Sequence, residues 1–397
     1  MELTEADIQP QTTRRQLGQS AITTPRKEKD QMEIDSGTEL GVTLGTPIRM
    51  RVMNENQRPK DYGNSTMDLY PRPSHADWTY LEKYGVKASS ARETIGMLTR
   101  VAGLQKVKVL TTAAGRVAAG AIAEEYLRLA HGIEVVAFVS SVGNEFFFPP
   151  TPTHPTLATN LEFLKMIEAI DCETVDSFAP VRCPNEEASK RMEKLVADFR
   201  DRHDNIGGMV TCVIRNCPSG LGEPCFDTGS GASTRNAGHT GNEGLRDWIR
   251  IWGLPNAGID TQRSLHQSAG RLAVAVRRVH ADAHPRLTTK TNNSGGIRGG
   301  ISNGAPIYFT VGFKPPATIG QAQQTATYGE EDGVLEAKGR HDPCVVPLAV
   351  PIVEAGADDH RLTLSTADAA DGEELIAAAQ ENRPRKANGG GEGGEEL

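Results

Sequence analysis

A glycine-rich run near residue 300 has the composition of a ligand cradle. Five glycines fall within the ten residues from Gly295 to Gly304. Because glycine has no Cβ, its backbone N–H groups can come close to a planar or phosphorylated ligand. The run matches neither the Walker loop nor the G-x-G-x-x-G fingerprint. A ligand cradle and a structural turn are therefore both open interpretations.

Two further motifs follow this run and carry charged side chains. Lys314 and Thr318 flank a double-proline turn after an apolar strand pattern, and together they can hold a phosphate. Arg340, His341 and Asp342 stand side by side before a proline. An arginine next to an aspartate favours the ionised carboxylate. A solvated surface turn is the alternative interpretation of both motifs.

The amino-terminal third holds two more candidates. His75 lies in a proline-bounded segment with Arg72, and a histidine can act as a general acid near neutral pH. Ser89, Ser90 and Arg92 begin a capping-box pattern, and a helix N-terminus of this kind can bind an anion. The alternatives are a polar surface loop and a plain helix cap.

The elements that position these residues follow from hydrophobic periodicity. Helices are predicted over residues 116–130, around Leu161–Ile167, and after Asn185 as N-cap, and strands over 133–139, 209–214 and 307–311. Helices and strands alternate, but the strand patterns are amphipathic rather than solidly apolar. This favours an α+β fold with antiparallel sheets over a doubly wound parallel sheet.

Composition excludes several classes of protein. The 397 residues carry a net charge of −8, so a nucleic-acid partner is not expected. No apolar run has the roughly 20 residues of a membrane span. Six cysteines form no C-x-x-C pair, which argues against a zinc site and a disulfide framework. The acidic first residues resemble neither a signal nor a transit peptide, so we expect a cytosolic protein without a membrane partner.

Together, the motifs resemble the chorismate synthase family in its fungal form. Three runs in combination carry the resemblance: Ser-Ser-Ala-Arg-Glu-Thr, Gly-Arg-His-Asp-Pro-Cys and Arg-Val-Ala-Ala-Gly-Ala-Ile-Ala. It covers about three-quarters of the chain and implies one domain over residues 1–355. Residues 97–115 are interpreted as an insertion, residues 228–286 as a divergent segment, and residues 356–397 as a low-complexity acidic tail.

The resemblance implies a chemistry and an assembly. The family removes phosphate from 5-enolpyruvylshikimate 3-phosphate by 1,4-anti elimination and gives chorismate, the last common step of the shikimate pathway in aromatic amino acid biosynthesis. It is a carbon–oxygen lyase that needs reduced FMN, and fungal members reduce their own flavin with NADPH. Its fold places a helical layer between antiparallel sheets, in a homotetramer.

Residue roles are carried over position by position. As implied by the resemblance, His75 supplies a proton or positive charge to the reduced flavin, and Asp342 helps to relay the flavin N5 proton. The substrate-binding positions are Arg72, Arg92 and Arg340, and the cofactor-binding positions are Ser89, Ser90, Gly299, Lys314, Thr318, Arg340 and, at the NADPH and substrate entrance, Arg15.

The sequence also departs from the family pattern. It contains no Tyr-Gly-Glu-Ser-His run, which holds the family's second essential histidine, and Gln16, Leu17 and Ala21 replace typical family residues. Loss of general-acid assistance costs about 10²–10⁴-fold in rate. We therefore expect little or no turnover from the chain as written. The alternative function is a non-catalytic paralogue, or a flavin-binding or flavin reductase remnant.

Overall fold

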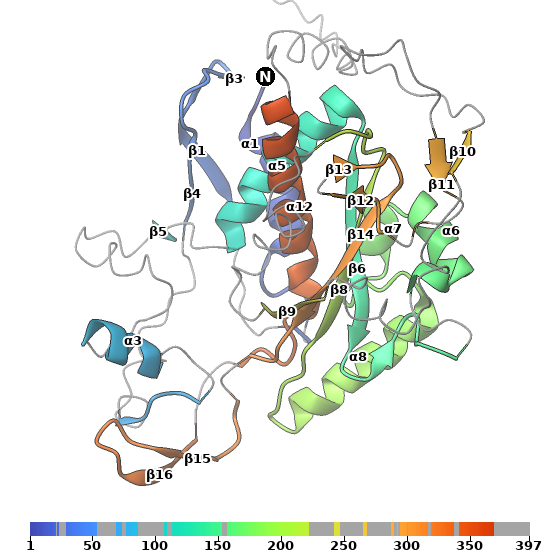
Figure 1. Ribbon diagram of the computed structural model, residues 1–397. Coiled ribbons are helices and arrows are strands. Elements are labelled where there is room, and N and C mark those ends of the chain that lie inside the picture. Colours follow the sequence, from blue (N-terminus) through green and yellow to red (C-terminus); the bar gives the residue numbers. More distant parts are fainter. Residues whose placement is uncertain are drawn as a thin grey trace, which may run out of the picture.

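The computed structural model describes most of the chain and leaves several segments out. The described residues are 1–20, 22–23, 29–53, 69–73, 77–85, 107–108, 113–152, 157–221, 242–246, 265–267, 287–289, 292, 294–299, 301–316, 319–336 and 341–368. Figure 1 shows their arrangement, with a group of helices between two sheets. Within these residues, none of the helices combines the length and apolar character that a bilayer crossing requires.

Helices form where the hydrophobic pattern has a helical period. They are α1 (Glu5–Arg15), α3 (Asp77–Tyr84), α5 (Ala113–His131), the 3₁₀ turn η2 (Leu157–Thr159), α6 (Leu161–Ala169), α7 (Cys172–Ser177), α8 (Glu186–Asp201) and α12 (Val346–Asp368). Local capping sets several starts. The Asn185 side chain accepts from the Ala188 N–H at 2.9 Å and begins α8, as predicted.

The strands build one larger sheet and several small ones. They are β1 (Met32–Ser36), β2 (Thr38–Glu39), β3 (Val42–Thr43), β4 (Arg49–Met53), β5 (Val107–Lys108), β6 (Glu134–Val142), β7 (Glu145–Phe146), β8 (Gly208–Arg215), β9 (Asn242–Arg246), β10 (Leu265–Gln267), β11 (Leu287–Thr289), β12 (Ile297–Arg298), β13 (Ile301–Ser302), β14 (Ile307–Phe313), β15 (Gln323–Ala326) and β16 (Asp332–Leu335).

The larger sheet is antiparallel and has the strand order β7-β6-β8-β14-β9. Its central register pairs Val136 with Val213 and Thr211 with Thr310. Residues 135–139 of β6 are buried on both faces, whereas the sequence predicted amphipathic strands. The reason is that α12 packs on one face of the sheet, while α6 and α7 fill the other.

A helical layer of α1, α5 and α12 separates this sheet from the smaller sheet β1-β4-β5 (Figure 1). Apolar side chains from α1, α5, β1 and β4 form a separate core cluster against the smaller sheet. α12 and α5 meet closely at Gly120, where an added Cβ would lie 2.3 Å from the Cβ of Ala355. The α+β fold with a helical layer between antiparallel sheets is thus present.

Three of the predicted segments contain residues that the structure describes. The predicted start of the acidic tail after residue 355 falls inside α12, which continues to Asp368. The segment 228–286 contributes β9, which pairs with β14 in the larger sheet, and β10. In the predicted insertion 97–115, the structure describes β5 and the first turn of α5.

Candidate functional site

The turn after α8 is hydrogen-bonded to two of the predicted ligand-binding segments, those that carry Lys314 and Asp342. The backbone N–H of Ile206 donates to the carbonyl of Pro343 at 2.9 Å. The Asn205 side-chain amide donates to the carbonyl of Pro316 at 2.7 Å. The segments that carry Asp342 and Lys314 are therefore fixed to two neighbouring residues of one turn.

Glycines allow the backbones to meet at this turn. A Cβ on Gly207 would lie 2.3 Å from the carbonyl oxygen of Phe313, directly before Lys314. A Cβ on Gly320 would lie 3.2 Å from the Cβ of His203 and 3.6 Å from Cδ2 of His341. The close approach at Gly207 excludes any larger residue, since the contact is with backbone rather than with a flexible side chain.

Asp342 has an unmet hydrogen-bonding capacity. Its Oδ1 atom is buried and, among the described residues, accepts no hydrogen bond. A buried acceptor without a donor costs free energy, and such atoms in native proteins need an explanation. A donor from a bound group would satisfy it.

Gly299 lies before strand β14 in the chain, whereas Lys314 lies after it. It occupies the turn between β12 and β13, with φ of +57°, and no atom lies within 4 Å of the place a Cβ would take. This hairpin precedes Ile307, whereas Lys314 follows Phe313. A strand of this length spans roughly 20 Å at about 3.3 Å per residue. The described chain thus places Gly299 and Lys314 at opposite ends of β14, and a flavin contact for both stays a prediction.

Two predicted ligand-binding arginines are each paired with a buried aspartate. Arg72 donates from Nε and Nη2 to the two carboxylate oxygens of Asp77, at 2.7 and 2.8 Å. Arg15 donates from Nη1 to Oδ2 of Asp30 at 2.8 Å. These contacts orient both guanidinium groups within the protein before any ligand binds.

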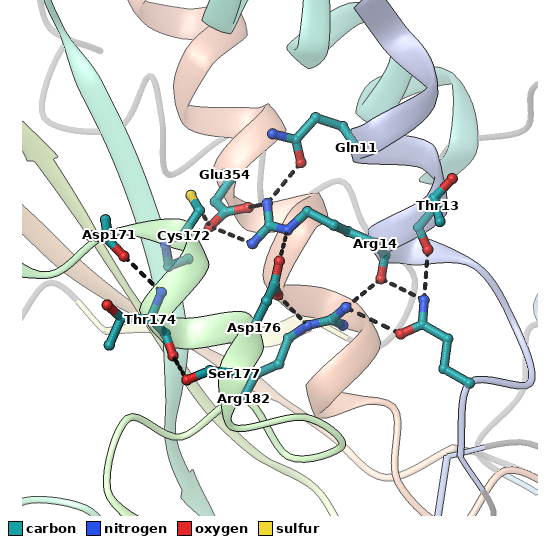
Figure 2. A network of polar contacts seen from close by, with 12 residues as sticks. Gln11, Thr13, Arg14, Asp171, Cys172, Thr174, Asp176, Ser177, Arg182 and Glu354 are labelled. Atoms are coloured by element: carbon teal, nitrogen blue, oxygen red, sulfur yellow. Dashed lines mark hydrogen bonds and ion pairs between the residues drawn. The ribbon is translucent and has the colours of Figure 1, made fainter. Parts of the chain in front are cut away.

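A largely buried ionic network includes the residue before Arg15 in the chain, and Figure 2 shows this network. The preceding residue, Arg14, contacts Asp176 at 2.6 Å and Glu354 at 2.5 Å. Arg182 contacts the other oxygen of Asp176 at 2.9 Å. The network joins α1, α7, α12 and the segment after α7, so it fixes the end of α1 from which Arg15 extends.

Electrostatics in this network depend on burial. Burial lowers the pKa of Arg14, but the negative charges around it, with Glu354 first, outweigh this effect and raise the pKa overall. Burial also raises the pKa of Glu124 on α5 to about 7, with a further contribution from Glu354. Cys172 is held protonated because burial raises the pKa of its thiol. The chemistry of this cluster is structural, since its charges are paired within the protein.

Comparison with known proteins decides the family. A family model described as chorismate synthase matches residues 1–232 and 259–360. The chain is 61% identical over 372 residues to chorismate synthase aro-2 of Neurospora crassa, covering 89% of this chain and 81% of that protein. It is 50% identical to the chorismate synthase of Schizosaccharomyces pombe over 89% of this chain and 85% of that protein.

The chain belongs to the chorismate synthase family.

A solved structure agrees at the level of the fold. It is titled "Crystal Structure of Chorismate Synthase", has a TM-score of 0.62 and 20% sequence identity, and is matched over 96% of this chain and 89% of that chain. The family model does not match residues 233–258, which lie within the segment 228–286 that was predicted to be divergent. It matches the remainder of that segment.

Chorismate synthases require a flavin in general, and the described residues fit such a group. The orphaned Oδ1 of Asp342 needs a hydrogen-bond donor, and a ring N–H of a reduced flavin would supply one if it bound there. Lys314 directly follows β14, in the segment that Asn205 contacts at Pro316, and its positive charge suits a flavin phosphate. Among the described residues no group of three or more potential metal ligands is present.

Six of the predicted site residues lie outside the described residues, so their roles stay predictions. They are His75, Ser89, Ser90, Arg92, Thr318 and Arg340. All six lie within the stretches that the family model matches.

The sequence did not point to the carboxylates that pair with Arg14, Arg15 and Arg72. Asp30 and Asp77 were not singled out, and neither was Glu354. A signal for Glu354 was present, because it is a single carboxylate inside the apolar run 345–357. A buried charge in such a run needs a partner, but nothing local identified Arg14 as that partner.

Proposed function

We propose that this chain is a chorismate synthase, a lyase that removes phosphate from 5-enolpyruvylshikimate 3-phosphate and forms chorismate. The match of the family model over residues 1–232 and 259–360 carries the proposal. Those two stretches contain every residue to which a site role was assigned. The 48% identity to a chorismate synthase of Saccharomyces cerevisiae over 89% of this chain supports it further.

Cationic side chains give the acidic protein a place for this substrate. The substrate carries a phosphate and two carboxylates, and the protein has a net charge of −8. Arginine binds such groups in a bidentate manner, and local charge outweighs net charge at short range. Arg72 and Arg15 are proposed to bind the anionic groups of the substrate and of NADPH, together with Arg92 and Arg340.

The cofactor part of the proposal is reduced FMN. When bound, it lends an electron transiently to the substrate, and the reaction has no net redox change. Lys314 is proposed to bind its phosphate, with Ser89, Ser90, Thr318 and Gly299 along the cofactor. Asp342 Oδ1 is proposed to hold the proton that moves near it, because that oxygen is buried and accepts no hydrogen bond from the described residues. His75 is proposed to supply a proton or positive charge nearby.

The decisive experiment is an anaerobic lyase assay on the purified chain. With photoreduced FMN and 5-enolpyruvylshikimate 3-phosphate, chorismate formation is followed by absorbance and phosphate release in parallel. If the wild-type chain turns over, an Asp342→Asn variant should lose about 10²–10⁴-fold of that kcat, the usual range for a proton-transfer group. The matched control is Asp332→Asn, an exposed carboxylate on β16, which should keep wild-type activity.

The same protein also tests the alternative. If oxidised FMN binds and no chorismate forms, the chain is a non-catalytic flavin-binding relative. If NADPH reduces FMN in its presence without lyase turnover, it is a flavin reductase. Turnover at rates typical of an enzyme would establish the lyase, and would show that the low turnover expected from the missing Tyr-Gly-Glu-Ser-His run was wrong.

Assembly and location complete the proposal. A homotetramer is proposed from the resemblance, and light scattering on the purified chain should give four times the monomer mass of 42.7 kDa. A cytosolic location is proposed as well. Cell fractionation with an antibody to this chain checks it, and enrichment in an organelle fraction would contradict it.

A further inference from the structure

Two arginines with proposed ligand roles share an arrangement that exposed ion pairs of this protein lack. The side chains of Arg15 and Arg72 are 17% and 14% exposed, and the carboxylates that hold them are 1% and 7% exposed. In the pair Arg51–Glu33, by contrast, both side chains are 43% exposed. The aspartate is the buried partner and the arginine the more accessible one in both cases.

The Arg72–Asp77 contact fixes a complete guanidinium plane. The two N–H groups on one edge donate to the two oxygens of one carboxylate, and the backbone N–H of Arg72 donates to the same carboxylate at 3.2 Å. Asp77 begins α3, where a negative charge is favoured by the helix dipole. The aspartate is therefore held by its own helix and orients both the side chain and the backbone of Arg72.

The Arg15–Asp30 contact is fixed from both sides. Asp30 has φ of +45°, a conformation uncommon outside glycine and tolerated best by Asn and Asp. Gln9, on the same helix as Arg15, accepts from the Met32 N–H at 2.9 Å and donates to the Asp30 carbonyl at 3.4 Å. The backbone at Asp30 and Met32, where β1 begins, is thus hydrogen-bonded to α1 at two points.

We propose that Asp30 and Asp77 are positioning residues, which hold the guanidinium groups of Arg15 and Arg72 in the orientation that anionic ligands need. The inference rests on the proposed function, from which it takes the ligands. A flexible arginine loses side-chain entropy when it binds a phosphate, and a guanidinium already held by a carboxylate loses less. A guanidinium has five N–H donors, so the contact with one carboxylate is compatible with further contacts.

The test uses Asp77→Asn and Asp30→Asn in the full chain. Binding of 5-enolpyruvylshikimate 3-phosphate in the presence of oxidised FMN is measured by titration calorimetry, which needs no turnover. We expect affinity to fall roughly 10- to 100-fold for Asp77→Asn, the range for a misplaced binding group. For Asp30→Asn we expect a comparable rise in the KM for NADPH in flavin reduction, with a smaller change in kcat.

Controls separate positioning from stability. Glu33→Gln breaks the exposed pair on the smaller sheet and should leave both affinities at wild-type values. Asp77→Glu, which keeps the charge, should recover part of the lost affinity. It also serves as the measured variant if Asp77→Asn does not yield folded protein, with Glu then expected to bind less tightly than wild type.

A double-mutant cycle gives the sharpest outcome. If Asp77 acts through Arg72, the double variant Arg72→Ala/Asp77→Asn should bind no more weakly than Arg72→Ala alone. Effects that add, or a wild-type affinity in Asp77→Asn, would overturn the inference and leave the proposed function standing. Absence of substrate and FMN binding in the wild-type chain would overturn the proposed function, and the positioning role of both aspartates with it.

Discussion

Arg14 keeps its charge inside the protein because three acceptors meet its guanidinium group. Asp176, Glu354 and the Gln11 side-chain oxygen all accept from it, at 2.6, 2.5 and 2.7 Å. Glu354 in turn accepts from the Ala137 N–H of β6 at 2.8 Å. A carboxylate on α12 therefore connects the amino-terminal helix with a central strand.

The first prediction concerns this carboxylate. Glu354→Gln leaves Arg14 short of a negative partner in a site where both side chains are buried, and breaking such a pair costs about 3 kcal/mol. Urea denaturation should show that loss in the free energy of unfolding. Glu186→Gln, which removes the exposed i,i+4 contact with Lys190, should cost less than about 0.5 kcal/mol. Equal losses in the two variants would contradict the role of the network.

The second prediction concerns Glu124 and pH. Burial raises its pKa from 4.5 to about 7, so the folded state resists ionising it. Stability from this group is complete below pH 4.5 and is lost as the pH rises to about 7. Glu124→Gln should therefore be more stable than wild type at pH 8, by about 1–3 kcal/mol, and the difference should vanish near pH 4. An advantage that does not change with pH would rule this explanation out.

At the scale of elements, the contact between α5 and α12 depends on small residues. Gly120 on α5 faces Ala355 on α12, and an added Cβ would lie 2.4 Å from the Ala355 Cα. Backbone contact at this distance leaves no room for a side chain. The two helices are therefore held at one separation.

The third prediction tests that separation. Gly120→Ala gains up to about 1 kcal/mol of helix propensity, yet it should lower the free energy of unfolding by about 1–3 kcal/mol because it overpacks the helix contact. Ala119→Ser adds one heavy atom on the exposed face of the same helix and should change stability by less than about 0.7 kcal/mol. A net stabilisation by Gly120→Ala, measured in urea, would show that the helices can move apart freely.

Elements with local signals could be predicted from the sequence, and elements fixed by distant partners could not. α8 has its cap, Asn185, and its apolar stripe within one segment, so both its type and its start were predictable. β9 pairs with β14 in a segment without an apolar period. Its existence depends on a strand more than sixty residues away, which no local pattern indicates.

The residues of the candidate site also divide into those with a local sequence signal and those whose position depends on distant partners. Lys314 and Asp342 were predicted from their motifs, but only the fold shows that the turn at Asn205 and Ile206 holds both segments. Arg72 was predicted as a ligand contact, and its partner Asp77 stands in the same motif. The partner was overlooked because a charge five residues away on a loop has no fixed direction before the backbone is known.

At the scale of the whole molecule, acid should destabilise the fold through one histidine. His131, the last residue of α5, is 9% exposed, and neither ring nitrogen has a hydrogen-bond partner among the described residues. Its ring packs edge-on against Tyr126, with 6.1 Å between ring centroids. Burial therefore lowers the pKa of His131, because the charged form would lose its hydration.

The fourth prediction follows from the lowered pKa of His131. His131 contributes full stability above its unfolded pKa of about 6.5, and this contribution is lost as the pH falls through the lower folded value. The Tm of the wild-type chain should therefore fall more steeply between pH 7.5 and 5 than the Tm of His131→Phe, which keeps a ring of similar size. Parallel Tm curves for the two proteins would refute the assignment.

The Arg14–Glu354 contact joins residues 340 positions apart, and this has a consequence for how the protein is made. A ribosome adds roughly 5–20 residues per second, so the partner of Arg14 is synthesised roughly 20–70 s after Arg14 itself. Until then α1, and α5 from the time it has been made, lack the helix α12 that completes their layer. Their apolar faces are then available to chaperones, and the nascent chain closes its core only when residues near 354 leave the ribosomal tunnel.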